Sequence, residues 1–365
     1  MSTPNDNVKV VVAMSGGVDS SVAAALLKQK GYRVSGVTMK IWQDTETALE
    51  EGKHHACYGP GEVEDIEDAR KVCQILDIPF YVFDLTKEYK DEVLDYYCRE
   101  YMSGRTPNPC FRCNSTVKFG ALLKKTRESG IEFDYFATGH YARVEYSKER
   151  RRHLLKKADD LSKDQSYFIS SLSQEQLAGA LFPIGDFTKD EIRKMASDFG
   201  LPVDNKPESQ DFIAGGYRLL IKEAPVGPIL DKQGKNLGKH KGIPFYTIGQ
   251  RKGLGVTDRE PLYVIDINSK DNAIIVGKIG ELYQDELLAS GLNWIAIEKL
   301  EQPIEVKARI RYRHKEAEAT VTPISNEIVH VKFKQPQLSI TPGQTVVFYQ
   351  GDAVVGGGTI DRSKE

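Results

Sequence analysis

The chain has 365 residues, of which 40% are hydrophobic and 28% are charged, a composition typical of a soluble globular protein with two or three domains. Its 50 Lys and Arg residues nearly balance its 52 Asp and Glu residues, which argues against a general nucleic-acid binder but leaves room for local basic faces. The first residues show no basic segment followed by a long apolar run, so we expect a cytoplasmic protein with no membrane partner.

The N-terminal part of the chain alternates predicted strands with predicted helices. Apolar, β-branched runs predict strands over residues 9–13, 34–39, 79–85 and 133–138, and helical spacing predicts helices over residues 20–30, 65–76 and 88–101. Such alternation is typical of a doubly wound parallel α/β sheet. Thr188 and Glu191 have capping-box spacing and predict the start of a further helix.

From about residue 227 the pattern changes to short strands and Gly-rich turns. Residues 304–313 and 328–334 alternate hydrophobic with polar residues, and residues 345–349 and 353–355 complete the set of strands. This pattern predicts a small antiparallel barrel or sandwich. We therefore expect an α/β domain over residues 1–205, a small central domain over 206–280 and a C-terminal β-barrel over 281–365.

A glycine-rich loop, SGGVDSS at residues 15–21, follows the first strand and opens the first helix. Glycine allows the backbone to approach a ligand closely, and the N–H groups at a helix N-terminus attract anions. Asp19 is placed to hold Mg²⁺ or to fix the loop. The loop differs from the G-x-x-x-x-G-K-[ST] loop of γ-phosphate transfer, so it indicates a phosphate site of another kind.

The five cysteines are an odd number in a chain without an export signal, which indicates a reducing compartment. Cys110 and Cys113 form a C-x-x-C motif on or beside the constrained loop 106–109, and Arg112 and Lys118 would favour a thiolate there.

The remaining three cysteines differ from one another. Cys57 follows His54 and His55 in a predicted loop, where it could be a metal ligand, a sulfur-handling thiol or an incidental neighbour. Cys73 and Cys98 fall in predicted helices and are expected to be inert.

Basic residues gather in three stretches, although the net charge is small. They are Arg150, Arg151, Arg152, His153, Lys156 and Lys157, then Lys232, Lys235, Lys239, Lys241, Arg251 and Lys252, and finally Lys307, Arg309, Arg311 and Arg313. Each alone is a solvated face, but three of them beside a phosphate loop favour binding to a phosphate backbone.

The loop SGGVDSS resembles the PP-loop of ATP pyrophosphatases, which adenylate a substrate oxygen. The strings VTMKIW, SGRTPNPCFRCNSTVKF, ATGHYARV, SKDQSYFISSLSQEQL, FYTIGQRKGLGV, RIRYRH and TPGQTVVFY resemble segments of the tRNA-specific 2-thiouridylase family, in family order, from about residue 9 to residue 360. This family converts the wobble uridine of certain tRNAs to 2-thiouridine. The resemblance implies ATP and Mg²⁺ as cofactors, and as partners a tRNA anticodon loop and a sulfur-carrier protein or sulfide.

The resemblance also implies roles for individual residues. The ATP-contacting positions would be Ala13, Met14, Ser15, Gly16, Gly17, Val18, Asp19, Ser20, Met39 and Gly139. The tRNA-contacting positions would be Asn108, Pro109, Cys110, His140, Lys163, Asp164, Gln165, Arg311, Tyr312 and Gln344. Cys113 would be a catalytic cysteine, whereas Cys110 stands where the family has an aspartate.

The sequence departs from the family because residues 208–216 lack the usual second catalytic cysteine. Two schemes remain open. A persulfide on the C-x-x-C pair could transfer its outer sulfur and leave a Cys110–Cys113 disulfide. Alternatively, Cys57, Cys110 and Cys113 could ligate an iron–sulfur cluster that holds a sulfide. Of the two we favour the cluster.

Two other functions are compatible with the PP-loop. One is an enzyme that adenylates the carbonyl oxygen of a small molecule, which the basic face of residues 304–313 argues against. The other is a nucleotide sensor or tRNA-binding module without catalysis, which the C-x-x-C motif beside the loop argues against. The sequence therefore favours ATP-dependent thiolation of tRNA.

Overall fold

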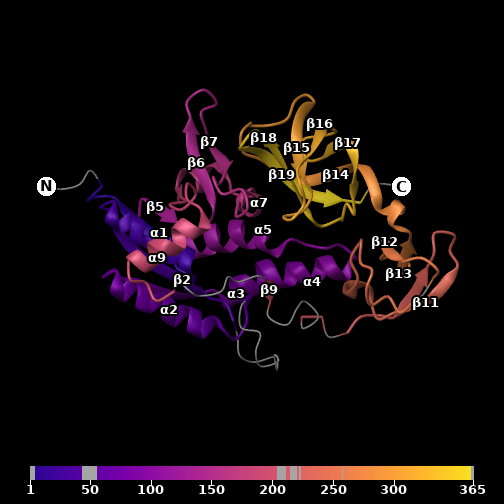
Figure 1. Cartoon of the computed structure of the whole chain (residues 1–365), viewed down its shortest axis with the longest axis horizontal. Helices are drawn as coiled ribbons and strands as arrows, with labels where there is room; N and C mark the ends of the chain where they lie inside the picture. The colour runs from indigo at the N-terminus through magenta and orange to yellow at the C-terminus, as the bar shows by residue number, and fades with distance from the viewer. Residues whose placement is uncertain are drawn as a thin grey trace. The chain divides into compact units, whose positions relative to one another are not determined.

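The structure, a computed structural model, describes residues 5–42, 56–203, 211–213, 220–221, 223–256 and 258–362. The chain divides into two units, one of residues 1–93, 110–216 and 352–354 and the other of residues 94–109, 217–351 and 355–365 (Figure 1). Within the described ranges, no helix has the length and apolar character needed to cross a membrane.

A five-stranded parallel sheet organises the first unit. Its strands, in spatial order, are β4 (Phe80–Asp84), β2 (Arg33–Lys40), β1 (Lys9–Ala13), β5 (Tyr135–Ala137) and β8 (Ala180–Leu181). The predicted doubly wound sheet is confirmed, with β8 as an addition because two residues are too few to give a pattern. The strand order reverses between β1 and β5, and ligands of such sheets bind beyond the carboxyl ends of the strands at that place.

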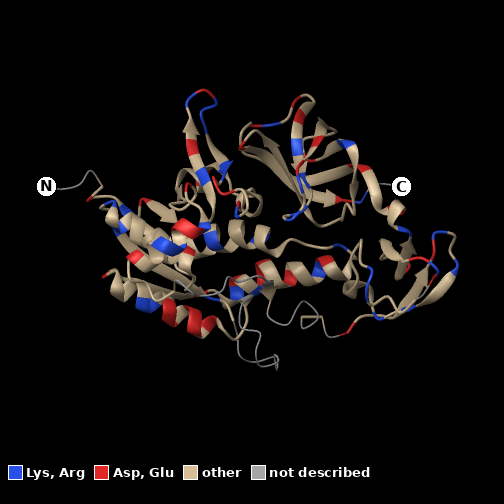
Figure 2. Cartoon of the chain, viewed as in Figure 1, with Lys and Arg blue, Asp and Glu red and all other residues tan. Residues whose placement is uncertain are grey.

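The first unit also contains helices. They are α1 (Val18–Gln29), α2 (Glu62–Ile75), α3 (Thr86–Tyr89), α5 (Pro109–Cys113), α6 (Leu122–Glu128), α7 (Ser166–Ile169), α8 (Gln174–Ala178) and α9 (Lys189–Asp198), with π-helical turns η1 (Lys90–Leu94) and η2 (Asn114–Ala121). Helix α1 is almost wholly buried against the sheet and α9. Helix α9 begins with the predicted capping box, in which Thr188 and Glu191 each accept the other's backbone N–H. Figure 2 shows that acidic residues run along α2.

Four short strands of the first unit lie outside the main sheet. Strands β6 (Ala142–Ser147) and β7 (Arg152–Lys157) form an antiparallel hairpin. Strands β3 (Ala56–Tyr58) and β9 (Asp211–Ile213) pair in parallel, far apart in sequence. None of the four is predicted from the sequence, because strands of three residues lack a periodic signal and the hairpin is rich in charge.

The second unit begins with α4 (Asp95–Met102), which contacts the 3-10 turn η4 (Ile243–Phe245). A four-stranded sheet follows in the order β11 (Asn236–His240), β10 (Gly227–Leu230), β13 (Ala273–Gly277) and β12 (Tyr263–Asn268). Its small core includes Ile229, Val264 and Ile274.

The C-terminal strands of the second unit close into a six-stranded antiparallel barrel, as predicted. After the turn η5 (Ile279–Leu282) they run, in spatial order, β14 (Tyr283–Trp294), β17 (Val329–Leu338), β16 (Ala317–Pro323), β15 (Ile304–Arg309), β18 (Thr345–Gln350) and β19 (Ala353–Asp361), and β19 pairs with β14. Inward-facing side chains such as Val306, Val331 and Phe348 fill the barrel.

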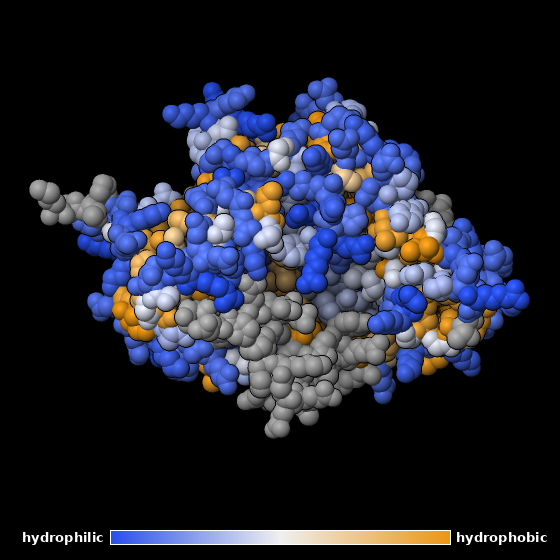
Figure 3. Space-filling model, in the orientation of Figure 1, coloured by the Kyte–Doolittle hydropathy of each residue, from blue (hydrophilic) through white to orange (hydrophobic). Residues whose placement is uncertain are grey.

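The strand predicted over residues 304–313 is too long. Strand β15 ends at Arg309, and the backbone then turns, with the His314 N–H donating to the Arg311 carbonyl at 3.0 Å. Arg311 and Tyr312 therefore lie beyond the strand, and Ile310 is the last residue of this stretch that is buried in the barrel core. Figure 3 shows a mostly hydrophilic face with small, separate hydrophobic patches.

Candidate functional site

The phosphate loop lies at the carboxyl end of β1 and at the N-terminus of α1. Gly17 is the N-cap residue of α1 and has no side chain to satisfy the first N–H groups of the helix. The Ser20 hydroxyl instead accepts from the Ser15 N–H at 3.1 Å and donates to the Gly17 carbonyl at 3.2 Å, which fixes the loop. The helix N–H groups are thereby left to an anion.

Two glycines in this region are required by close backbone contacts. Gly16 has φ of +71°, and a β-carbon there would overlap the carbonyl oxygen of Asp65. Gly139, after β5, lies so near the loop that a β-carbon would be 2.5 Å from the Ser20 nitrogen. Larger residues at either position would force the loop and its neighbours apart.

Asp19 is held by two side chains that the sequence analysis did not single out. Its carboxylate accepts from the Lys189 ammonium at 2.7 and 2.9 Å and from the Tyr141 hydroxyl at 2.8 Å. Lys189, the first residue of α9, is only 7% exposed. An ion pair this well enclosed fixes Asp19 beside the loop.

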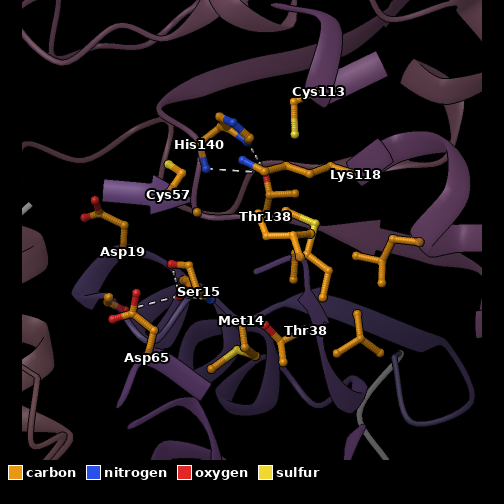
Figure 4. A pocket seen from close by; sticks show the side chains of 18 of the residues that line it. Met14, Ser15, Asp19, Thr38, Cys57, Asp65, Cys113, Lys118, Thr138 and His140 are labelled. Carbon is orange, nitrogen blue, oxygen red and sulfur yellow. Dashed lines mark hydrogen bonds between the residues drawn. The ribbon is translucent and has the colours of Figure 1, made fainter. Parts of the chain in front are cut away.

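A cavity of about 340 Å³ opens beyond the ends of β1, β2 and β5, the size of a small-molecule site. Nine of the ten predicted ATP-contacting residues line it, namely Ala13, Met14, Ser15, Gly17, Val18, Asp19, Ser20, Met39 and Gly139. Gly16 is the tenth and instead allows the close approach of Asp65. The same cavity is lined by Cys57, Cys110 and Cys113. Figure 4 shows Cys113 and Lys118 across the cavity from Ser15 and Asp65.

The thiols of the C-x-x-C motif are protonated at neutral pH. Burial raises the pKa of Cys113 to about 11 and that of Cys110 to about 12, and the nearby Lys118 ammonium only partly opposes this effect. The prediction that Arg112 and Lys118 would favour a thiolate is thus wrong for Arg112, whose guanidinium binds Glu92 at 2.7 Å. Lys118 does face the thiols, but desolvation outweighs its charge.

Aromatic side chains hold the wall that carries Cys57. Tyr58 lies edge-on to Trp42, with ring centroids 4.8 Å apart, and stacks on Tyr89 at 5.5 Å. Tyr89 in turn stacks on Phe212 of β9 at 6.5 Å. His54 and His55, which precede Cys57, lie outside the described residues. Across the described ranges, no three His, Cys, Asp or Glu side chains are arranged to hold a metal ion, so the geometry does not support the favoured cluster.

Among the predicted tRNA-contacting residues of the first unit, His140 and Gln165 line the cavity and Asp164 does not. Burial, with a contribution from Lys118, lowers the pKa of His140 to about 3, so its imidazole is neutral and bonded to the Thr138 hydroxyl at 2.7 Å. Asp164 is 2% exposed and accepts from the Ser166 N–H and hydroxyl. Lys163 is half-buried.

The predicted tRNA-contacting residues of the second unit make structural contacts. The Gln344 amide donates to the carbonyls of Thr106 and Pro107 at 2.9 and 3.3 Å, and the Asn108 amide donates to Thr345 at 3.3 Å. Arg311 donates to the Leu338 carbonyl at 3.0 Å. Tyr312 and Pro109 are half-buried. These contacts fix the loop before α5 and the turn after β15.

All six basic residues of the stretch over residues 232–252 are exposed, whereas the other two basic stretches are only partly exposed. In the β6–β7 hairpin, Lys157 is buried and Lys156 pairs with Glu145 at 3.3 Å, whereas Arg150 and Arg151 are at the tip. On the barrel, Lys307 and Arg313 are exposed and Arg309 is half-buried. Figure 2 shows both basic and acidic residues at the tip of the hairpin.

Three protein-family descriptions match successive parts of the chain. Residues 8–214 match the family described as tRNA methyl transferase HUP domain, residues 218–278 its PRC-barrel domain, and residues 264–360 the aminomethyltransferase β-barrel domain. The first match contains the five-stranded parallel sheet, the second contains the four-stranded sheet, and the third contains most of the barrel.

Individual relatives are similar over almost the full length. The chain is 49% identical over 364 residues to tRNA-specific 2-thiouridylase MnmA 1 of Caldanaerobacter subterraneus subsp. tengcongensis, covering 98% of both chains. It is 47% identical over 365 residues to tRNA-specific 2-thiouridylase MnmA of Clostridioides difficile, covering 98% of this chain and 99% of the relative. A 4-thiouridine synthetase in complex with RNA and ATP is 20% identical over 57% of this chain and 46% of that one, with a TM-score of 0.33.

Proposed function

Since this chain belongs to the tRNA-specific 2-thiouridylase family, we propose that it is an ATP-dependent tRNA-uridine 2-sulfurtransferase that acts on the wobble uridine of the anticodon loop. One observation carries the proposal: the phosphate loop and the C-x-x-C thiols line a single cavity. Activation of an oxygen and delivery of sulfur can therefore take place on the same bound base.

The first step activates the base. A uridine inside a stacked loop is out of reach, so it must be splayed out into the cavity. Its O2 attacks the α-phosphorus of ATP, and pyrophosphate leaves with the electrons of the broken P–O bond. The N–H groups of the loop at residues 15–20 stabilise the charge that develops. Mg²⁺ bound with ATP would supply further charge neutralisation, and Asp19, a residue of the loop that lines the cavity, would hold it.

The ion pair between Asp19 and Lys189 indicates how the phosphate loop is held. Lys189 is buried and 2.7 Å from Asp19, and the pair lies at the N-terminus of α1. Asp19 lines the cavity, whereas Lys189 does not line it and holds the Asp19 carboxylate in place through their ion pair. Lys189 is thus a positioning residue for the loop.

The second step delivers sulfur. The outer sulfur of a persulfide on Cys113 attacks C2 of the adenylated uridine, and AMP leaves with the bonding pair. The Cys110 thiolate then attacks the Cys113 sulfur. The bond to the outer sulfur breaks, 2-thiouridine is released and a Cys110–Cys113 disulfide forms. An external dithiol reduces this disulfide, and the persulfide comes from a sulfur-carrier protein.

The iron–sulfur alternative fits the structure less well. The three cavity cysteines do not form a metal-ligand set, and no step is derived through a cluster. Iron and labile sulfide in protein purified without oxygen separate the schemes. Iron-free protein that is fully active with a persulfide donor supports the disulfide scheme, whereas activity that follows iron content contradicts it.

The proposed function is tested with purified protein, ATP, Mg²⁺, a persulfide donor and a tRNA transcript that carries uridine at the wobble position. We expect ATP- and tRNA-dependent pyrophosphate release and 2-thiouridine in the digested tRNA, detected by mass spectrometry. The matched control is the same transcript with cytidine at that position. Pyrophosphate release that a small-molecule substrate supports without tRNA would instead indicate an adenylating enzyme of small molecules.

A further inference from the structure

The three thiols of the cavity differ in how far solvent reaches them. Cys113 is buried with 8% exposure, Cys110 is half-buried and Cys57 is exposed. A thiol that must accept sulfur from another protein has to be reachable from outside, because exchange proceeds by direct attack of one sulfur on another. Of these three, Cys57 meets that requirement and Cys113 does not.

The position of Cys57 is set by the pairing of strand β3, which carries it, with strand β9. Strand β3 pairs with β9 so that Ala56 faces Asp211 and Tyr58 faces Ile213, which puts Cys57 level with Phe212. Tyr89 of α3 stacks on Tyr58 of β3 and on Phe212 of β9, and these contacts pack the two strands against α3. Cys57 and Phe212 both line the cavity.

The thiols are also close enough to influence one another electrostatically. A charge on Cys57 raises the pKa of both Cys110 and Cys113, after the larger effect of burial. Burial raises the pKa of Tyr89, and the nearby thiols of Cys113, Cys57 and Cys110 raise it further. Burial lowers the pKa of Lys118, but the same three thiols raise it, and the net pKa is raised. One lysine and one tyrosine thus sit among three sulfurs.

We propose that Cys57 is the entry thiol of the sulfur relay, which accepts sulfur from a carrier protein and passes it to Cys113. This inference rests on the proposed function and adds a catalytic residue to it. The carrier's persulfide is attacked at its outer sulfur by the Cys57 thiolate, which leaves a Cys57 persulfide and the carrier thiol. The Cys113 thiolate then attacks that outer sulfur, which gives a Cys113 persulfide and regenerates the Cys57 thiol. No oxidant or reductant is consumed in either transfer.

The relay accounts for the protection of the reactive sulfur. A persulfide on an exposed residue is open to reduction by any thiol in solution, whereas one on Cys113 is enclosed. Moving the sulfur inward before the base is attacked separates capture from chemistry. Cys110 keeps its role of attacking the Cys113 sulfur, which releases 2-thiouridine and forms the Cys110–Cys113 disulfide.

The test compares two sulfur donors in the same assay. One is a carrier protein loaded with a ³⁵S persulfide, and the other is cysteine persulfide, which is small enough to enter the cavity. For Cys57→Ala we expect carrier-dependent 2-thiouridine formation to fall by about tenfold or more, while formation from cysteine persulfide stays within about twofold of wild type. Cys98→Ala, on α4 in the second unit, is the control and should match wild type with both donors.

Alkylation and peptide mapping before tRNA is added should place the labelled sulfur on Cys57 as well as on Cys113. Carrier-dependent activity of Cys57→Ala equal to wild type overturns the relay, and so does an equal loss with both donors. A wild type that forms no 2-thiouridine overturns the proposed function itself, together with the relay. Normal thiolation by Cys57→Ala and none by Cys113→Ser overturns the relay alone.

Discussion

The cavity of the first unit and the barrel of the second unit use their polar groups in opposite ways. Around the cavity, the N–H groups of the loop and the thiols face a hollow. In the barrel and the loop before α5, Gln344, Arg311 and Asn108 donate to groups of the protein itself. The residues that match family motifs are therefore of two kinds: some line the ligand cavity, and others form hydrogen bonds that stabilise the protein's own loops and turns.

This difference indicates where RNA affinity resides. A polar side chain that already bonds to buried backbone gains little by exchanging that bond for one to RNA, since the first partner would be left unsatisfied. An exposed lysine or arginine releases counterions when it meets a phosphate. We expect barrel affinity to come from exposed charges such as Lys307 and Arg313 more than from Gln344.

The largest effect is expected at Cys113. Cys113→Ser should lower 2-thiouridine formation by about a thousandfold or more, because a hydroxyl cannot carry a persulfide. Pyrophosphate release should persist, since adenylation precedes sulfur transfer. Nucleoside mass analysis and a pyrophosphate assay on the same samples measure both steps. Normal 2-thiouridine formation would remove Cys113 from the mechanism.

The next effect concerns the phosphate end of the cavity. Asp19→Ala should lower tRNA-dependent pyrophosphate release by about a hundredfold, because the loop loses its carboxylate and Lys189 loses its partner. The affinity for tRNA should be unchanged, as measured by filter binding. Asp19→Asn keeps the shape and is the matched control for charge. An equal loss of tRNA affinity in Asp19→Ala would place RNA, not ATP, at the loop.

The third prediction concerns pH. With a Cys113 pKa of about 11, the thiolate fraction at neutral pH is small and rises about tenfold per pH unit. Loading of Cys113 by cysteine persulfide should therefore accelerate from pH 7 to pH 9. Lys118→Met should slow it at each pH, because the ammonium that lowers the pKa is removed, whereas Lys118→Arg should restore much of the rate. A rate independent of pH would mean that loading is not limited by this thiol.

The smallest effect is expected on the barrel. Arg311→Ala should weaken tRNA binding severalfold and lower the slope of log affinity against log salt by about one if the guanidinium also meets a phosphate. Lys307→Ala, on the exposed side of β15, should lower the slope without disturbing the turn. Binding titrations at several salt concentrations measure both. An unchanged slope in Arg311→Ala would assign this arginine to the Leu338 contact alone.

Much of the first unit could be predicted from sequence, because β1, α1 and the loop between them form one continuous local pattern. The contacts of Lys189 and Tyr141 with Asp19 could not, since the two residues lie 170 and 122 residues from it in sequence. Tyr141 stands in the string ATGHYARV and Lys189 in the predicted capping box, but neither pattern indicates a contact with the loop. The same holds for the pairing of β3 with β9. The end of β15 was missed because alternation continues in sequence after the backbone has turned. The predicted helix over residues 88–101 is divided between the two units.

The acidic residues of α2 also bear on how an RNA arrives, which is a matter of encounter rates. The backbone of Asp65 touches Gly16 of the loop, and Glu64 and Glu67 project from the same helix into solvent. A polyanion that approaches over this helix meets repulsion with a range of about 8 Å at physiological ionic strength. Encounters of RNA with this helix are therefore expected to be shorter-lived than encounters with other parts of the surface. A chain with a net charge of only -2 can in this way select the orientation in which its substrate docks.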